Sequence, residues 1–265
     1  SSPSKTIPIL SINNEMVISK QLKNSSIVHQ IKPRLFYLYA QEENQDDIPI
    51  FDTGWNTFSF AQLFRDNRFS GLDRTSDANQ LSISISNNFY DLENYRNIFN
   101  FSIGKIIYFE DRNISVDNET LYTRSNSNYI AEMEYRPKEN ISLISTFLYD
   151  SNADDQKTVF NNHTLQYRGQ GNNIFNASYR YSKNDIAQGD MSFAWEVANN
   201  LSLLGRWNYD FKNNENNTDT GDDIETLAGL EYESCCWKAR LIQRRYKTDI
   251  EVYEKEIQFQ IMLKG

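Results

Sequence analysis

Two adjacent cysteines, Cys235 and Cys236, are the only cysteines of the 265-residue chain and the side chains best suited to form a covalent bond. Neighbouring cysteines can hardly bond each other, because the peptide between them would have to distort. Structural disulfides form in oxidising compartments, of which the periplasm is one. With no third cysteine in the sequence, we expect each thiol to pair outside this chain. Two free thiols are the alternative.

The two histidines, His29 and His163, are the other residues that could take part in catalysis. A hydrolase of the Ser-His or Asp-His type is conceivable, but neither histidine lies in a recognisable catalytic motif, and we expect both to be solvated or to face the inside of the protein. Zinc-type spacing, a glycine-rich phosphate loop and an EF-hand pattern are all absent from the sequence. Acidic pairs such as Glu42-Glu43 are better explained as a solvated loop than as a cation site. We therefore predict no enzyme, no metal and no cofactor.

The composition limits the class of protein. A net charge of −9 argues against nucleic acid as a partner, because phosphate binding needs a basic surface. No run reaches the roughly 18 apolar residues of a transmembrane helix. The aromatic content of 14% suits the aromatic girdles of a membrane β-barrel, although a soluble β-sandwich rich in tyrosine would also fit. From Ser1 onward no charged and apolar leader is present, so we expect a removed targeting peptide or an internal piece of a longer protein.

The elements that position the cysteines are strands. The segment before Cys235 and the segment after Cys236 both alternate with a period of two, which predicts a hairpin with the thiols at its tip. The same period predicts thirteen strands in all. We expect them at 8–20, 27–40, 79–90, 98–110, 128–137, 141–150, 158–168, 173–183, 189–197, 200–211, 222–233, 236–247 and 255–264.

The lengths of the strands and of their connections favour a membrane barrel. Most predicted strands reach the roughly 9–11 residues that cross a bilayer at a tilt, whereas soluble strands average about five or six. Short connections alternate with longer ones, which are acidic or asparagine-rich (41–78, 111–127, 212–221). Outer-membrane barrels have short periplasmic turns and long extracellular loops. The sequence thus predicts an all-β, antiparallel up-and-down transmembrane barrel with the cysteine tip on the periplasmic side.

The number of strands indicates that the barrel is incomplete. Single-chain bacterial barrels have an even number of strands, and an open sheet would leave two unpaired edges in the bilayer. We therefore predict that residues 1–265 form the C-terminal part of one larger barrel domain.

The long connection 41–78, predicted to be extracellular, contains aromatic residues that a solvated loop would not need. These include Phe51, Trp55, Phe58 and Phe60. We expect the connection to pack inside the barrel or over its mouth, as a plug, as a cap or as a self-packed loop with no role in transport. Its alternating Arg and Asp residues suggest local ion pairs.

Four segments of the chain match a known family. They are Pro33-Arg34-Leu35-Phe36-Tyr37-Leu38-Tyr39, Phe51-Asp52-Thr53, Leu63 to Arg74 with Asp77-Ala78-Asn79-Gln80, and Tyr232-Glu233-Ser234-Cys235-Cys236. Together they resemble the LptD family of lipopolysaccharide-assembly proteins of Gram-negative outer membranes. The resemblance covers essentially the whole chain and is specific in the long connection and the Cys-Cys turn.

The resemblance implies a 26-stranded barrel, of which this chain supplies the C-terminal half, preceded by a periplasmic jellyroll domain. It implies that lipopolysaccharide leaves sideways between the first and last strands, and that a plug lipoprotein of the LptE type fills the lumen. It also implies that Cys235 and Cys236 pair with two cysteines of the N-terminal periplasmic region. If 255–264 is the last strand, Ile257, Phe259, Ile261 and Leu263 lie on one edge of the lateral gate, and Gln258 and Gln260 face the lumen. A porin or a substrate-specific transporter barrel is the alternative.

Overall fold

The computed structural model describes residues 5–116, 123–154, 157–183, 185–212, 221–249 and 252–263. Within these ranges it contains fourteen strands and one short 3-10 helix, η1. The asparagine-rich segment 213–217 lies outside the described residues. The elements are β1 (Ile9–Glu15), β2 (Ile18–Gln21), β3 (Ile27–Ala40), η1 (Phe60–Phe64), β4 (Ala78–Asp91), β5 (Arg96–Tyr108), β6 (Tyr129–Lys138), β7 (Ile141–Tyr149), β8 (Thr158–Arg168), β9 (Ile174–Ser182), β10 (Ile186–Ala198), β11 (Leu201–Asp210), β12 (Asp222–Glu233), β13 (Trp237–Asp249) and β14 (Val252–Leu263).

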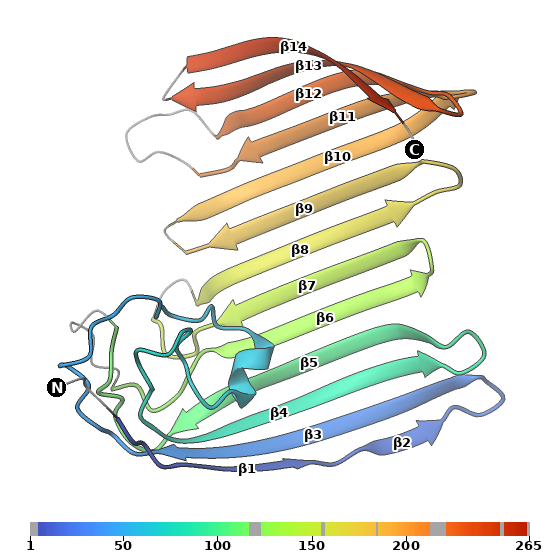
Figure 1. Cartoon of the computed structure of the whole chain (residues 1–265). Helices are drawn as coiled ribbons and strands as arrows, with labels where there is room; N and C mark the ends of the chain where they lie inside the picture. Colours follow the sequence, from blue (N-terminus) through green and yellow to red (C-terminus); the bar gives the residue numbers. More distant parts are fainter. Residues whose placement is uncertain are drawn as a thin grey trace. The chain divides into compact units, whose positions relative to one another are not determined.

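The chain divides into two compact units, and the boundary between them runs through β6 and β7. The first unit comprises residues 1–133 and 147–157, and the second comprises 134–146 and 158–265. In the first unit the ladder order is β1-β3-β4-β5, and in the second it runs from β8 to β14 in the order of the chain (Figure 1). Each register given for these ladders is antiparallel. The prediction of an all-β, antiparallel, up-and-down sheet is therefore confirmed.

The first predicted strand, 8–20, is wrong in one respect, because it is broken into β1 and β2. Both pair with the same edge of β3, where Glu15 faces Arg34 and Ile18 faces Ile31. Between these pairs Met16 N donates to Pro33 O at 3.1 Å. Proline has no N–H and cannot return the bond, so the ladder is interrupted opposite it. The described residues accordingly form fourteen strands, because the first of the thirteen predicted strands is divided into two.

The two terminal strands each have one ladder. Among the described residues, β1 pairs with β3 and β14 pairs with β13, and neither has a second partner strand. A ladder between 8–20 and 255–264 would have indicated a closed barrel, and none is present in the part of the chain that the structure describes. The strands therefore fit part of an up-and-down barrel.

The connections differ in length at the two ends of the strands. We call the end with the connections 22–26, 92–95, 169–173, 199–200 and 234–236 the turn end, and the other the loop end. At the loop end β3 is joined to β4 through 41–77, and β5 to β6 through 109–128. The final connection departs from this pattern, since β13 continues to Asp249 and β14 begins at Val252, closer together than predicted.

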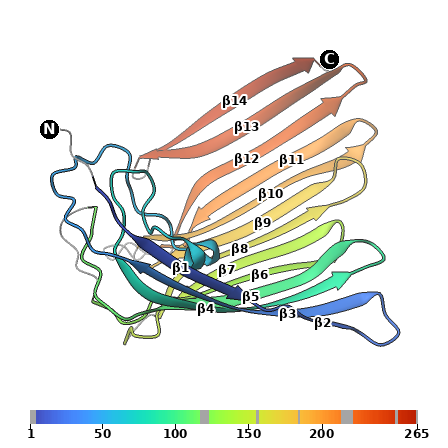
Figure 2. The ribbon, with the colours of Figure 1, turned by 60° about the horizontal axis from the view of Figure 1, so that its bottom comes forward.

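Residues 41–77 pack on one face of the first unit (Figure 2). Leu63 in η1 is fully buried and forms a cluster with Ile106 and Ile130. Gly104 of β5 makes this approach possible, because a Cβ there would lie 2.6 Å from Leu63 Cδ1 and 2.8 Å from Ile83 O. The Ser82 hydroxyl donates to the carbonyl of Leu63. No helix of the described residues is long and apolar enough to cross a membrane.

Candidate functional site

In β4 of the first unit, apolar side chains are exposed and small polar ones are buried, the reverse of the pattern in a soluble protein. Ile83 and Ile85 of β4 are about two-fifths exposed, whereas Ser82 and Ser84, which alternate with them, are buried under the 41–77 connection. We call these two surfaces the apolar face and the polar face of the strands. Membrane barrels have this arrangement, with lipid outside and a polar lumen.

The apolar face of the second unit carries aromatic clusters near both ends of its strands. At the loop end Tyr209 contacts Trp207 and Phe211, with ring centroids 5.3 and 4.8 Å away. At the turn end Tyr232 lies 5.3 Å from Trp237. Between them are exposed apolar residues of the middle rows, namely Met191, Phe193, Leu203, Leu230 and Leu241. An apolar band between two aromatic girdles is typical of a transmembrane barrel.

The polar face of the second unit carries a row of charges with one residue on each of five neighbouring strands. Glu225 lies at its centre and accepts from Arg206 at 3.3 Å and from Arg244. The signs alternate along the row, so each charge has an opposite neighbour. We call it the charged row: Asp190 (β10), Arg206 (β11), Glu225 (β12), Arg244 (β13) and Glu256 (β14).

A second charged group lies nearer the turn end. Glu231 is 5% exposed and accepts from Lys238 Nζ at 2.8 Å and from Arg240. Lys238 also reaches Glu233 at 2.9 Å. The sequence predicted a face with charges of both signs, but only the strand register determines which charges meet.

Cys235 and Cys236 lie at the tip of the β12–β13 turn, and both are exposed. Ser234 N donates to Trp237 O at 2.9 Å, which closes the turn and projects both side chains from the turn end. Their Sγ atoms are 2.7 Å apart, longer than the about 2.05 Å of a disulfide bond. Both side chains are exposed at the tip of the turn.

β14 presents Ile257, Phe259, Ile261 and Leu263 on its apolar face, and they are 75%, 66%, 62% and 85% exposed. Their polar alternates lie on the same face as the charged row. Gln258 donates to Glu256 at 2.8 Å, and Gln260 is the register partner of Arg240. The strand thus has an apolar and a polar face and one edge that no other described strand pairs.

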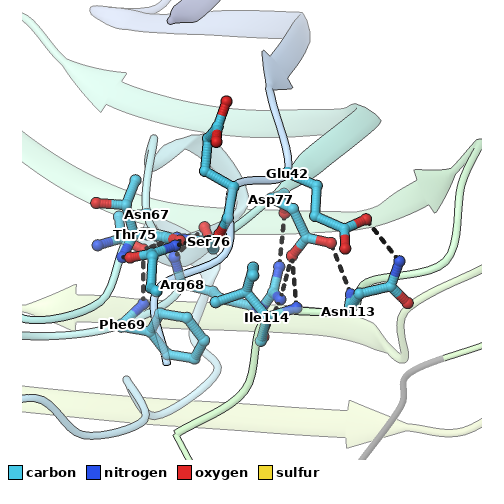
Figure 3. Close-up of polar contacts among 11 residues, drawn as sticks. Glu42, Asn67, Arg68, Phe69, Thr75, Ser76, Asp77, Asn113 and Ile114 are labelled. Carbon is cyan, nitrogen blue, oxygen red and sulfur yellow. Dashed lines mark hydrogen bonds and ion pairs between the residues drawn. The ribbon is translucent and has the colours of Figure 1, made fainter. Parts of the chain in front are cut away.

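The 41–77 connection is held on the first unit by an ion pair that the sequence indicated only as alternating charge. Arg68 donates to Asp77 Oδ1 at 2.6 Å and to the carbonyls of Asp77 and Ile114. Asp77 also accepts from the backbone N–H groups of Asn113 at 2.6 Å and Ile114 at 3.3 Å. Figure 3 shows these bonds linking the two long connections, with Asn113 reaching Glu42 at 2.7 Å. We call Arg68 and Asp77 the connection clamp.

The other Arg and Asp residues of this segment mostly bond to the backbone. Arg74 donates to the Ile48 carbonyl at 2.7 Å, and Asp73 accepts from the N–H groups of Phe51 and Asp52 at 2.7 and 2.9 Å. These bonds hold the pKa of Asp73 at about 2, below its usual range. The expectation of local ion pairs was therefore only partly right.

Both histidines lie on the apolar face of the strands, so the inward-facing alternative of the expectation is wrong. His29 is the register partner of Phe89 and stacks on its ring at 4.4 Å, and His163 is the partner of Tyr179, so both lie on the apolar face. His163 Nδ1 is 3.0 Å from Ser145 Oγ. Among the described residues no group of three or more His, Cys, Asp or Glu side chains is arranged to hold a metal ion.

Comparisons with known proteins agree with this geometry. A family model described as LptD, LPS transport system D, matches residues 1–209. The chain is 33% identical over 253 residues to the LPS-assembly protein LptD of Hahella chejuensis, covering 94% of this chain and 30% of that protein. It is 33% identical over 265 residues to the protein of the same name from Nitrosococcus oceani, covering 99% and 35%. It is 32% identical over 314 residues to the LPS-assembly protein LptD of Pseudomonas savastanoi pv. phaseolicola, covering 100% of this chain and 33% of that protein. The chain spans about a third of the length of these curated relatives.

Proposed function

The chain belongs to the LptD family, and from this we propose that it is the C-terminal part of an outer-membrane barrel that inserts lipopolysaccharide into the outer leaflet by lateral release. One structural observation supports the membrane location most directly. The apolar faces of the strands expose isoleucine, leucine and phenylalanine side chains, which is favourable where the outer medium is the hydrocarbon of a bilayer. The comparisons do not favour a porin or a substrate-specific transporter.

Transport across such a barrel is a physical rather than a chemical task. The polar face, with its charged row, offers a path for the phosphorylated sugar headgroup, and the acyl chains pass between parted strands into lipid. If β14 is the last strand of the barrel, it forms one edge of that gate through Ile257, Phe259, Ile261 and Leu263. The exposed edge of β14, which no other described strand pairs, supports this assignment.

The partners we propose are lipopolysaccharide, a plug lipoprotein of the LptE type, and the jellyroll domain and remaining barrel strands of the same protein. Cys235 and Cys236 bond to cysteines of the periplasmic region. The exposure of both thiols at the turn end supports this pairing, because short turns lie on the periplasmic side of such barrels.

A cross-link across the gate tests the lateral release. In the full-length protein, Ile261→Cys is joined by a short cross-linker to a cysteine introduced in the first barrel strand. We expect the cross-link to stop the appearance of new lipopolysaccharide on the cell surface. Leu241→Cys is the matched control, since it lies on the same face one strand away from the edge. Undiminished export through a fully cross-linked barrel would exclude this gate.

A non-reducing gel of the full-length protein tests the disulfides. We expect a mobility shift that disappears when Cys235→Ser and Cys236→Ser are combined and persists in the control Ser234→Ala. A shift that survives in the double cysteine variant would show that other residues make the bonds.

A further inference from the structure

A cavity of about 280 Å³ lies in the first unit, between the 41–77 connection and the polar face of its strands. Ligand pockets usually hold about 300–1,000 Å³, so this one suits a single sugar or a phosphate group and not a whole lipid. It is lined by four arginines, Arg65, Arg68, Arg112 and Arg124, and no Asp or Glu is among the described residues that line it. In a chain with a net charge of −9, this is a local concentration of positive charge.

Only part of that charge is neutralised by neighbouring carboxylates. Arg68 is paired with Asp77, and Arg124 Nη1 lies 2.7 Å from Asp150. Arg112 lies over the Tyr108 ring at 3.5 Å and donates to a backbone carbonyl. Arg65 is exposed and has no ion pair within the described residues. Of the four arginines, Arg65 is therefore the one whose guanidinium has no carboxylate partner among the residues that the structure describes.

The cavity also has polar groups whose hydrogen-bonding capacity is not used. Arg68 Nε and Asn56 Nδ2 are buried donors with no acceptor among the described residues. A buried donor without an acceptor is costly, and bonds to a charged acceptor are stronger than neutral ones. Burial lowers the pKa of the Arg112 guanidinium. An anion in the cavity would give the two buried donors the acceptor that they lack.

The remaining lining residues fit the body of a sugar. Amide side chains such as Asn56 and Asn126 can both donate and accept, as sugar hydroxyls do, and the Trp55 and Phe58 rings supply apolar surfaces. A divalent cation does not fit, because the lining lacks carboxylates. An acyl chain does not fit, because it would bury guanidinium groups without an acceptor.

We propose that this cavity is a binding site for an anionic sugar, in which the arginines bind a phosphate group and the amides and aromatic rings hold the sugar ring. Its source, the phosphorylated headgroup of a passing lipopolysaccharide, rests on the proposed function. The cavity is lined by Leu38, Gln80 and Tyr108, near the loop ends of β3, β4 and β5, where a headgroup would leave the lumen before its acyl chains.

Binding to the purified full-length barrel with its lipoprotein tests the site directly. Calorimetry measures the binding of three probes, glucosamine 6-phosphate, glucosamine and inorganic phosphate. We expect glucosamine 6-phosphate to bind, and Arg65→Gln and Arg112→Gln each to weaken it about tenfold, the effect of losing one charge-assisted hydrogen bond. Arg180→Gln is the matched control, because Arg180 is an exposed strand arginine outside the cavity and should leave binding unchanged.

Two outcomes would overturn the proposal. Unchanged binding in both cavity variants would show that the arginines do not bind the phosphate. Equal binding of glucosamine, or of inorganic phosphate alone, would exclude a phosphosugar site. Since Arg65 is exposed and unpaired, Arg65→Gln is not expected to impair folding, which hydrogen exchange of β8–β14 checks.

The source of the sugar is tested separately in cells. A photoreactive amino acid at position 67 should cross-link to lipopolysaccharide, and about tenfold less to lipopolysaccharide from a strain that lacks headgroup phosphates. Equal cross-linking of both forms would exclude the headgroup as the ligand. If the gate cross-link does not affect export, the proposed function is overturned, but binding of the phosphosugar in vitro is not. Failure of the proposed function and failure of the cavity proposal can therefore be told apart.

Discussion

Removal of the Asp77 carboxylate should release the 41–77 connection from the strands beneath it. The Asp77 side chain is 6% exposed, and its two oxygens accept from Arg68 and from two backbone N–H groups. Asp77→Ala leaves a largely buried guanidinium without its counter-charge and two N–H groups without an acceptor. Loss of one partner of a buried pair costs about 3–5 kcal/mol. We take the lower value, because Arg68 is 22% exposed and keeps its bond to the Ile114 carbonyl.

A loss of about 3 kcal/mol in the free energy of local opening corresponds to roughly a hundredfold faster exchange of the amides that depend on it, since each 1.4 kcal/mol is a factor of ten. The amides to follow are those of Asn56 and Ser70, which bond to Arg68 O at 3.2 Å and to Gly54 O at 2.9 Å. Hydrogen exchange with mass spectrometry on the full-length barrel in detergent measures them.

Two variants separate the buried ion pair from a general effect of sequence change. Asp66→Ala removes an exposed carboxylate of the same connection and should leave exchange unchanged. Arg68→Met with Asp77→Leu removes both charges and should open the connection less than Asp77→Ala alone, because no uncompensated charge remains. Exchange in Asp77→Ala within about threefold of the wild type would refute this account of the clamp.

Three further predictions concern other contacts. Leu63→Ala should lower the free energy of opening of the same connection by about 2–5 kcal/mol, because Leu63 is fully buried, and the same exchange measurement checks it. Glu225→Gln removes the charge shared by Arg206 and Arg244 and should destabilise the second unit by about 1–3 kcal/mol, measured by urea unfolding of the barrel. The lowered pKa of Asp73, about 2, means that its carboxylate stabilises the connection above its ordinary pKa of 3.8. This stability should be lost as the pH falls from about 4 to 2, a change that tryptophan fluorescence would follow and that Asp73→Asn should abolish.

Each of these has a control and a contradicting result. For Leu63 the control is the exposed Leu72→Ala, and equal effects of the two would show that Leu63 does not anchor the connection. For Glu225 the control is Glu254→Gln at the exposed loop end, and an unaffected urea midpoint in Glu225→Gln would mean that the row contributes no stability. A transition between pH 4 and 2 that persists in Asp73→Asn would assign it to another carboxyl.

The long connection is neither a solvated loop nor one that packs only on itself. Its hydrophobic residues, Leu63 foremost, pack on Ile106 and Ile130 of the strands, and the clamp joins it to the second long connection. On the proposed function it therefore lies inside the lumen, near the extracellular end.

The sequence was enough to predict where most strands lie, which residues share a face, and at which end of the strands Cys235 and Cys236 are found. These depend on local periodicity and on connection length, and a period of two needs no knowledge of the neighbouring strand. Residues 27–40, 158–168 and 222–233 were predicted with the bounds that the structure has. The break between β1 and β2, opposite Pro33, was not predicted. Because proline has no N–H, its place in a strand with two neighbours could have indicated this break.

The contacts between side chains of different strands and connections could be established only from the fold. The charged row requires the registers of five strands, since a change of one residue in any ladder would separate Glu225 from Arg206 or Arg244. The arginine cavity requires the connection to be docked, because Arg65 and Arg124 are far apart in the sequence and approach each other only when Leu63 packs over Gly104. The Cys-Cys turn lies between these cases: its position follows from the sequence, and the exposure of both thiols follows from the fold. Local pattern sets the direction of a side chain, whereas its partners depend on contacts between distant segments.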